Sequence, residues 1–190
     1  MFSYNYKYSQ AWFLTAEIKD KLAGFLDRLQ ENRMLEIGCF EGLSSVFFAD
    51  NFLNHPNARL TCVDPFLTIS TNDHKQFLQN SEEKTFDFNL SVCQNGNKIT
   101  VHKLTSDEFF KINDKTYNFI YIDGCHETEF IMRDMENSFK CLEKNGIMWM
   151  DDYEGGNDRQ IAATMNTFLR KHNGEYKIIH MGYQLAIEKL

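Results

Sequence analysis

The sequence predicts an α/β fold: a doubly wound sheet of about seven strands, mostly parallel, with a C-terminal antiparallel hairpin. Through most of the chain, short apolar runs alternate with longer amphipathic segments, as parallel strands covered by helices on both faces do. The last two apolar runs, 176–180 and 183–188, are separated only by Met181-Gly182. A connection this short joins neighbouring antiparallel strands and therefore predicts the hairpin.

The elements follow from the spacing of apolar residues. Leu14, Ile18 and Leu22 begin a three-to-four-residue repeat that predicts a helix over 10–31. Five apolar runs predict the parallel strands, at 34–38, 59–64, 98–104, 118–123 and 147–150. The segments between and after them predict helices over 43–52, 72–90, 127–142 and 158–172, and a short one that Thr105 caps.

Length and composition set the broad class. A chain of 190 residues is expected to form one domain, with 1–31 as an N-terminal helical cap and 32–190 as the core. The hydrophobic content of 43% and the aromatic content of 14% indicate a packed globule rather than a disordered chain. The 27 acidic and 20 basic side chains give a net charge of −7, which argues against nucleic acid as a partner.

The expected compartment is the cytoplasm. The first residues have no basic patch followed by an apolar run, and no stretch is long and apolar enough to span a membrane. The five cysteines are scattered without a C-x-x-C pair, which favours buried thiols over zinc or disulfides. The sequence does not determine an oligomeric state, and a homodimer is the default expectation because it is the commonest oligomer.

Acidic side chains mark the ends of the predicted strands. Sheets of this kind bind ligands beyond the carboxyl ends of their strands. Carboxylates recur at these ends, and the residues at the five ends are Glu36–Ser44, Asp64, Ser106 with Asp107, Asp123, and Asp151 with Asp152. Chance placement of loop acids explains some of these positions but not so regular a set.

The first of these ends contains a two-glycine turn. Gly38 and Gly42 allow the backbone to approach a ligand closely, although such a turn by itself is more often structural. The spacing is not G-x-G-x-x-G, and Glu36 and Glu41 suit a ligand with a cationic end better than a pyrophosphate. Asp64 stands where an acid binds ribose hydroxyls, so the combination favours a nucleoside ligand with a cationic group.

Taken together, these motifs resemble a known family. The motif Glu-x-Gly-x-x-x-Gly-x-Ser at 36–44, Asp64, Asp123-Gly-x-His126 and Asp-Asp-Tyr at 151–153 are similar to those of class I S-adenosylmethionine-dependent methyltransferases. Within them the chain resembles the metal-dependent O-methyltransferases, which include catechol and macrocin O-methyltransferases. The resemblance runs from about residue 33 through the hairpin and implies a Rossmann-like core and an enzyme. One departure is Asp151-Asp152, where the family often has Asp-Asn or Glu-Asp.

The resemblance also implies site residues. The cofactor S-adenosyl-L-methionine would be held by Glu36, Gly38, Gly42 and Ser44 at its methionine end, by Asp64 at the ribose, and by Ser106 or Asp107 at the adenine. A divalent cation, Mg²⁺ by default, would be held by Asp123, Asp151 and Asp152. His126 falls where relatives place a general base, and Asp123 belongs with it to the catalytic set as well as bordering the cofactor.

Electrostatics supports the cation independently. Neighbouring strands lie about 4.8 Å apart, so the carboxylates that end the fourth and fifth strands should converge. Two such charges ~5 Å apart repel by roughly 3 kcal/mol at an effective dielectric of 20. Protonation of one acid, or a capping Asp151 with a solvated Asp152, are the alternatives to a hard cation. His126 has an alternative of its own, as a helix cap or surface residue.

The predicted substrate is a small hydroxylated molecule, first a sugar or glycan precursor and second a catechol-like compound. Residues that could contact it lie in three regions: the aromatic N-terminus (Tyr4, Tyr6, Tyr8, Trp12), the segment 66–97, and the loop 153–157 with its two glycines. Two other classes remain open from the sequence: a nucleotide-dependent oxidoreductase on a similar sheet, and a catalytically inactive methyltransferase fold that serves as a binding module.

Overall fold

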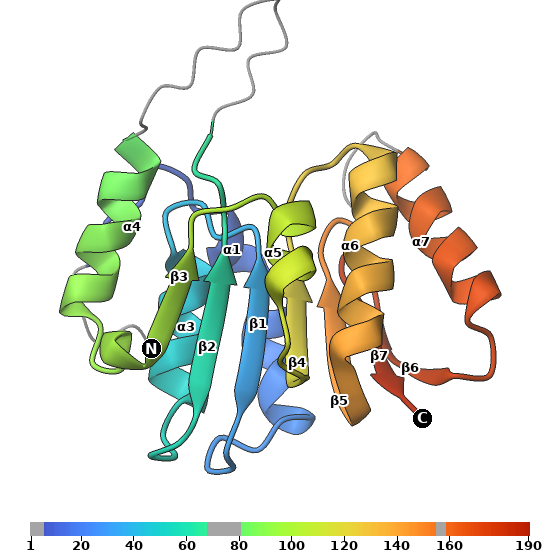
Figure 1. Cartoon of the computed structure of the whole chain (residues 1–190), viewed down its shortest axis with the longest axis horizontal. Helices are drawn as coiled ribbons and strands as arrows, with labels where there is room; N and C mark the ends of the chain where they lie inside the picture. The colour runs from blue at the N-terminus through green and yellow to red at the C-terminus, as the bar shows by residue number, and fades with distance from the viewer. Residues whose placement is uncertain (1–5, 68–80, 155–158) are drawn as a thin grey trace, which may run out of the picture.

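The computed structural model describes residues 6–67, 81–154 and 159–190. They form one seven-stranded sheet in the order β3-β2-β1-β4-β5-β7-β6, flanked by helices (Figure 1). Its strands are β1 (Arg33–Ile37), β2 (Arg59–Val63), β3 (Ile99–His102), β4 (Tyr117–Ile122), β5 (Leu142–Met150), β6 (Tyr176–Met181) and β7 (Leu185–Lys189). The first five strands are parallel and β7 is antiparallel to both β5 and β6, which confirms the predicted fold class.

The helices lie on both faces of the sheet. They are α1 (Trp12–Thr15), α2 (Ile18–Lys21), α3 (Leu43–Phe52), α4 (Ser81–Val92), α5 (Ser106–Ile112), α6 (Thr128–Cys141) and α7 (Arg159–Lys171), with 3-10 turns η1 (Leu22–Gly24) and η2 (Gly96–Lys98). Because successive strand residues face opposite sides, the core has two halves. Tyr121 and Trp149 pack toward α1, α2 and α3, whereas Ile120 and Met148 pack toward α5, α6 and α7.

The N-terminal segment corrects one prediction. The helix expected over 10–31 is replaced by α1, α2 and η1, and Ala16 between the first two is extended, with φ −64° and ψ 135°. Phe13, Ile18 and Leu22 are nevertheless buried against the sheet face. The apolar spacing therefore reported burial correctly, but one-turn helices held by tertiary contacts satisfy it as well as one long helix does.

Other boundaries differ less. The segment 68–80, which includes part of the helix expected over 72–90, lies outside the described residues, and α4 accounts for the rest of that helix. β5 begins at Leu142 rather than Ile147, because Leu142 pairs with Tyr117 before an irregularity in the register. Thr105 caps α5 as predicted: its hydroxyl accepts from the Glu108 amide, and the Glu108 carboxylate accepts from the Thr105 amide.

The topology also places the ligand edge. β1 and β4 are sheet neighbours, and the chain runs outward from them in opposite directions, through β2 and β3 on one side and β5 on the other. The carboxyl ends of β1, β2, β4 and β5 therefore lie along one edge, at the switch point where such sheets bind ligands. Among the described helices, none is both long and apolar enough to cross a membrane.

Candidate active site

The glycine turn after β1 lies between the carboxyl ends of β2 and β4. Gly38 has φ +84°, and a Cβ at this position would lie 1.9 Å from the carbonyl oxygen of Asp123. The Gly38 amide donates to Val63 O at 2.9 Å, and the Asp123 amide donates to Ile37 O at 2.8 Å. The turn thus continues the hydrogen bonding of both adjoining strands at their ends. Only glycine fits in it, because any Cβ would overlap the Asp123 carbonyl oxygen.

Gly42 has a different reason to be glycine. It is the N-cap of α3 with φ +79°, and a Cβ there would lie 2.7 Å from the ring of Phe86 on α4. The described residues thus place the Phe86 side chain on one side of this glycine. The turn it closes still directs the start of α3 toward the carboxyl ends of the strands.

Glu36 lies behind this turn. Its carboxylate is fully buried and accepts hydrogen bonds from the hydroxyls of Ser44 and Ser45 and, at 3.3 Å, from the Cys62 thiol. Burial raises the pKa of Glu36 to about 7, although these three donors oppose the shift. The Glu36–Ser44 hydrogen bond holds the first turn of α3 from within, and Ser45 and Cys62, which were not among the predicted site residues, complete this set of donors.

Asp64 holds the same turn from the other side. Its Oδ2 accepts from the amides of Cys39 at 2.8 Å and Phe40 at 3.0 Å, and its Oδ1 accepts from the Phe66 amide at 2.7 Å. Phe40 has a left-handed φ of 48°, which side chains larger than Asn or Asp rarely adopt. Asp64 therefore stabilises a strained turn, a second duty beside the predicted one at the ribose.

Ser106 and Asp107 begin α5 beside the end of β4. The Asp107 carboxylate pairs with Arg133 of α6 at 3.0 Å. Burial raises the pKa of Asp134 on α6 to about 6, although Ser106 opposes the shift, and the Asp134 Oδ2 lies 3.5 Å from a Cβ built on Gly124. Asp134 was missed by the sequence reasoning; the available signal was an acid inside the apolar stripe of α6, at a position the structure buries.

The acids after β4 and β5 come together as their strand positions suggested. One carboxylate oxygen each from Asp123 and Asp152 and a ring nitrogen of His126 all lie within 4.8 Å of one another. The His126 Nε2 is 3.1 Å from Asp152 Oδ2. The Tyr121 hydroxyl lies 3.2 Å from Asp123 Oδ2 and 3.3 Å from Asp151 Oδ2, so it joins the remaining acid to the group.

Comparison with known proteins identifies the family of this chain. A family model described as "Methyltransferase domain" matches residues 35–153, more than half of the chain and every strand end described above. The chain belongs to this methyltransferase family. It is accordingly an S-adenosylmethionine-dependent methyltransferase, as the resemblance implied. None of the curated proteins matches it.

Several solved structures share the fold of this methyltransferase. The O-methyltransferase TomG from Streptomyces achromogenes, in complex with SAM, has a TM-score of 0.67 at 14% identity over 93% of this chain and 81% of its own. An rRNA methylase from Streptococcus thermophilus has a TM-score of 0.64 at 13% identity, over 90% and 93%. An O-methyltransferase from Bacillus cereus, in complex with SAH, has a TM-score of 0.60 at 15% identity, over 98% and 84%.

Asp152 of this methyltransferase has an unusual backbone. Its φ is 61°, and its Oδ1 accepts from the Tyr183 hydroxyl at 2.5 Å. Aspartate and asparagine are the side chains that best tolerate this left-handed region. The second residue of the Asp-Asp pair therefore turns its carboxylate toward His126 and the β6–β7 turn, while Asp151 continues the line of β5.

The acidic cluster, defined as Asp123, Asp151 and Asp152, carries strong like-charge repulsion. Burial first, and then the charges of Asp151 and Asp152, raise the pKa of Asp123 well above its usual range. Burial and Asp152 also raise the pKa of Asp151 against an opposing hydrogen bond from Gln184. In the described part of the chain His126 is the only basic side chain paired with these acids. Oxygen donors held this close fit a hard divalent cation.

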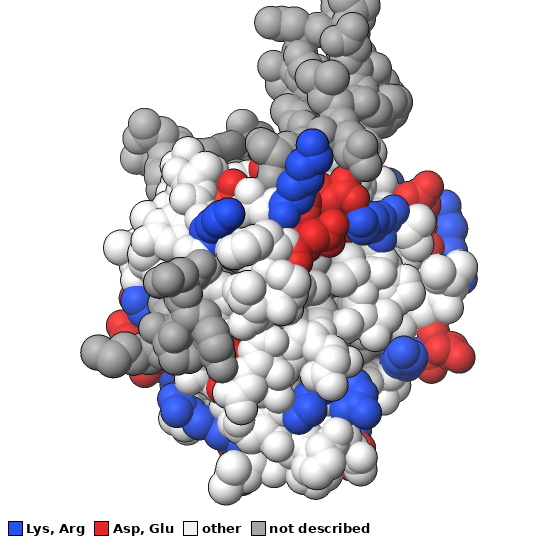
Figure 2. All heavy atoms as spheres, turned by 90° about the vertical axis from the view of Figure 1, so that its left-hand side faces the viewer, with Lys and Arg blue, Asp and Glu red and all other residues white. Residues whose placement is uncertain are grey.

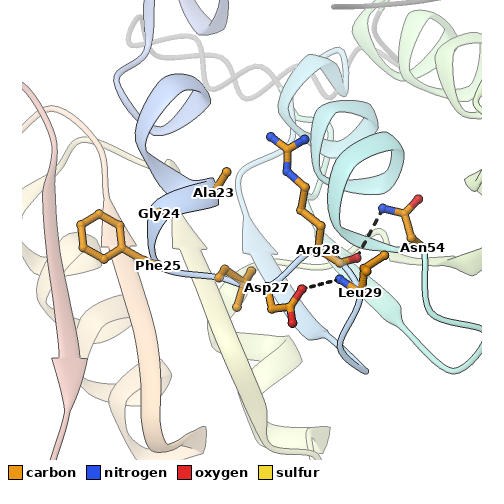
Figure 3. Close-up of a pocket in the computed structure, with 8 residues that line it drawn as sticks. Ala23, Gly24, Phe25, Asp27, Arg28, Leu29 and Asn54 are labelled. Atoms are coloured by element: carbon orange, nitrogen blue, oxygen red, sulfur yellow. Dashed lines mark hydrogen bonds between the residues drawn. The ribbon is translucent and has the colours of Figure 1, made fainter.

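A surface hollow elsewhere in the methyltransferase is not part of this site. It is lined by residues 23–29 and Asn54 (Figure 3). The Asn54 amide donates to Arg28 O at 3.3 Å, and the Leu29 amide donates to Asp27 Oδ1 at 2.8 Å. Asn54 follows the C-terminal end of α3 and residues 27–32 lead into β1, so the hollow lies at the amino ends of the strands.

Proposed function

We propose that this methyltransferase transfers the methyl group to a hydroxyl of a small polyhydroxylated molecule, with a divalent cation held by the acidic cluster. The observation that carries this proposal is the juxtaposition of Asp123, Asp152 and His126, with Asp151 joined through Tyr121, beside the glycine turn. A cluster of carboxylates this costly is best explained by a cation that neutralises it. Mg²⁺ is the default cation because the ligands are mostly oxygen.

The cofactor side uses the turn between β1 and α3. S-adenosylmethionine, when bound, supplies a methyl group on a positively charged sulfur. Gly38, Gly42 and Ser44 would border its methionine end, with Glu36 fixing Ser44 from behind. Asp64 would take the ribose hydroxyls with the lone pairs that its three amide donors leave free, and Ser106, Asp107 and Asp123 would complete the pocket.

The catalytic side uses the acidic cluster and His126. A divalent cation, when bound to Asp123, Asp151 and Asp152, lowers the pKa of a coordinated hydroxyl. With its Nε2–H donated to Asp152, neutral His126 carries its lone pair on Nδ1, and this nitrogen would take the proton of the substrate hydroxyl. Asp152 thereby orients the base while the rest of the site aligns the hydroxyl oxygen with the methyl group.

The substrate class rests on exposed aromatic side chains at the glycine turn and at the acidic cluster. Trp12 is exposed, and its ring centroid lies 5.5 Å from that of Phe40 in the glycine turn. Tyr183 is also exposed and contacts Asp152. An exposed aromatic face suits the C–H face of a sugar, our first choice, or a catechol-like ring, the alternative. Tyr4 and the glycines of the loop 153–157 lie outside the described residues.

RNA is a less well supported substrate class than a small molecule, although the similar structures include rRNA methylases. On the face shown in Figure 2, basic side chains are separated by acidic and uncharged ones and form no continuous band. The net charge of −7 also opposes a phosphate backbone.

Calorimetric titration tests the proposal. S-adenosylmethionine is titrated with Mg²⁺ and with EDTA, and Mg²⁺ is titrated into the wild type and Asp151→Ala. We expect cofactor binding that survives EDTA and a separate Mg²⁺ isotherm that Asp151→Ala removes. Sugars and catechols are then screened for methylation. Cofactor binding without any cation binding would overturn the metal role, and a fully inactive protein across both substrate classes would favour a binding module.

A further inference from the structure

Gln184, immediately before β7, is fully buried, and each polar atom of its side chain is engaged. Its Oε1 accepts from the Ile18 amide at 2.7 Å and from the Trp149 indole at 3.0 Å. Its Nε2 donates to Asp151 Oδ1 at 2.6 Å and to the Tyr121 hydroxyl at 3.4 Å. One amide thus connects the N-terminal segment to the acidic cluster.

The orientation of this amide is fixed by its partners. A backbone N–H and an indole N–H can only donate, so the oxygen of Gln184 must face Ile18 and Trp149. The NH₂ group must then face Asp151 and Tyr121. Because Tyr121 receives one of these hydrogens, its own hydroxyl proton is free for Asp123 Oδ2 or Asp151 Oδ2.

The N-terminal segment is clamped to the β6–β7 turn in return. The backbone N–H of Gln184 donates to Glu17 Oε2 at 3.0 Å, and His180 Nε2 lies 2.9 Å from the same oxygen. A Cβ on Gly182 would lie 2.8 Å from either Glu17 carboxylate oxygen, so the carboxylate is packed against this glycine. Glu17 does not cap α2 with its own side chain, and Gln184 supplies the acceptor for the Ile18 N–H instead.

We propose that Gln184 is a positioning residue: it holds Asp151 in the orientation that the acidic cluster needs, and it does so only while Glu17–Ile18 is docked on the β6–β7 turn. The proposal deepens the proposed function and rests on it insofar as Asp151 is a cation ligand. With Oδ1 held by Gln184, Asp151 keeps Oδ2 on the side of Tyr121 and Asp123. Partners of this kind commonly change metal affinity by about 10–100-fold when removed.

The consequence is a link between the N-terminus and catalysis. The same segment carries Trp12, which packs on Phe40 of the glycine turn. If the segment undocks, the Gln184 oxygen loses its Ile18 donor and the amide is free to rotate away from Asp151. Docking of the N-terminal segment would therefore complete both the cover over the glycine turn and the geometry of the acidic cluster.

Amide hydrogen exchange tests the link without cation, cofactor or substrate. Exchange at the Ile18 amide is measured in the wild type, Asp151→Ala, Gln184→Met and the double variant. We expect Gln184→Met to accelerate it at least about tenfold and Asp151→Ala about fivefold, the scale of one hydrogen bond. The double variant should match Gln184→Met alone, because Asp151 acts through Gln184. An Ile18 exchange rate that Asp151→Ala leaves unchanged would overturn the link.

Cation affinity tests the positioning itself, with Mn²⁺ as the probe. Gln184→Met should weaken Mn²⁺ binding about tenfold and leave S-adenosylmethionine affinity within about twofold. Trp149→Phe is the matched control, because it removes a donor on the oxygen side and leaves the bond to Asp151; Mn²⁺ affinity should change by less than about twofold. Suppose that Asp151→Ala no longer binds Mn²⁺ but that wild type and Gln184→Met bind it with equal affinity. This result would overturn the inference about Gln184 while the proposed function stands.

Two further arms keep the outcomes distinct. If the wild type binds no Mn²⁺, the cation role fails, and the exchange cycle alone decides whether Gln184 positions Asp151. If Gln184→Met does not fold, Gln184→Leu replaces it, since leucine is apolar and cannot donate to Asp151. Asp151→Ala should then no longer alter Ile18 exchange in the Gln184→Leu background, and a retained effect would contradict the proposal.

Discussion

Two acid-rich regions lie along the same edge of the sheet, and they differ in how many hydrogen-bond donors surround their carboxylates. At the ends of β1 and β2, Glu36 and Asp64 each accept three hydrogen bonds from neighbouring residues of the chain. At the ends of β4 and β5, the acidic cluster has fewer donors and more mutual repulsion. The partners of an acid, rather than its position at a strand end, therefore decide whether its carboxylate is satisfied by hydrogen bonds within the chain.

Replacement of Asp151 by alanine should give the largest effect in the acidic cluster. Cation-dependent methylation should be abolished, because a ligand is lost, while S-adenosylmethionine affinity should stay within about twofold. Activity and cofactor titration of the purified variant check both parts. Activity that persists in this variant with EDTA present would remove the distinction between the two regions.

His126→Ala should lower kcat by about 10²–10⁴-fold, the usual contribution of a general base. Cation affinity should fall much less than in Asp151→Ala if His126 is a base, because the three aspartates remain. Steady-state rates on the identified acceptor, with Mn²⁺ titration beside them, separate the roles. A loss of cation affinity equal to that of Asp151→Ala would make His126 a ligand instead.

Gly38→Ala should destabilise the turn by several kcal/mol, because its Cβ would overlap Asp123 O and its φ is left-handed. Gly174→Ala is the control, with φ +91° and nothing within 4 Å of the added Cβ. The control should cost only about 1–2 kcal/mol of conformational strain. Urea unfolding of both variants measures the difference, and equal costs would show that the contact with β4 does not matter.

Glu36→Gln should change how stability depends on pH. The folded pKa of about 7 lies above the ordinary 4.5, so the folded state binds the proton more tightly and stability falls as pH rises between these values. Ionisation of Glu36 should lower the free energy of unfolding by at most about 3 kcal/mol over this pH range, and Glu36→Gln should not show this decrease. Urea unfolding at pH 5 and pH 8 tests this, with the exposed Glu154→Gln as control. A wild-type slope retained in Glu36→Gln would mean that Glu36 is charged when folded.

The sheet and the meeting of its acidic strand ends could be predicted from the sequence, whereas the backbone of the N-terminal segment could not. The alternation of apolar runs predicted the sheet, because burial on both faces leaves few other arrangements for such strands. The acids at the ends of β4 and β5 could be expected to meet, because neighbouring parallel strands end at the same edge. The helix expected over 10–31 was wrong, because apolar spacing records which residues are buried and not which backbone carries them.

The fold class, the expected ligand edge and the family could be inferred from the order of residues alone, since they depend on local periodicity and short motifs. The hydrogen-bond partners of each acid follow only from the folded arrangement of the chain. Glu36 and Asp64 are satisfied by donors that folding brings to them, and Asp151 is held by Gln184, which in turn grips Ile18 from the far end of the chain. Hydrogen bonds between residues so distant in sequence leave no periodic trace, because they depend on where the strands and turns finally lie.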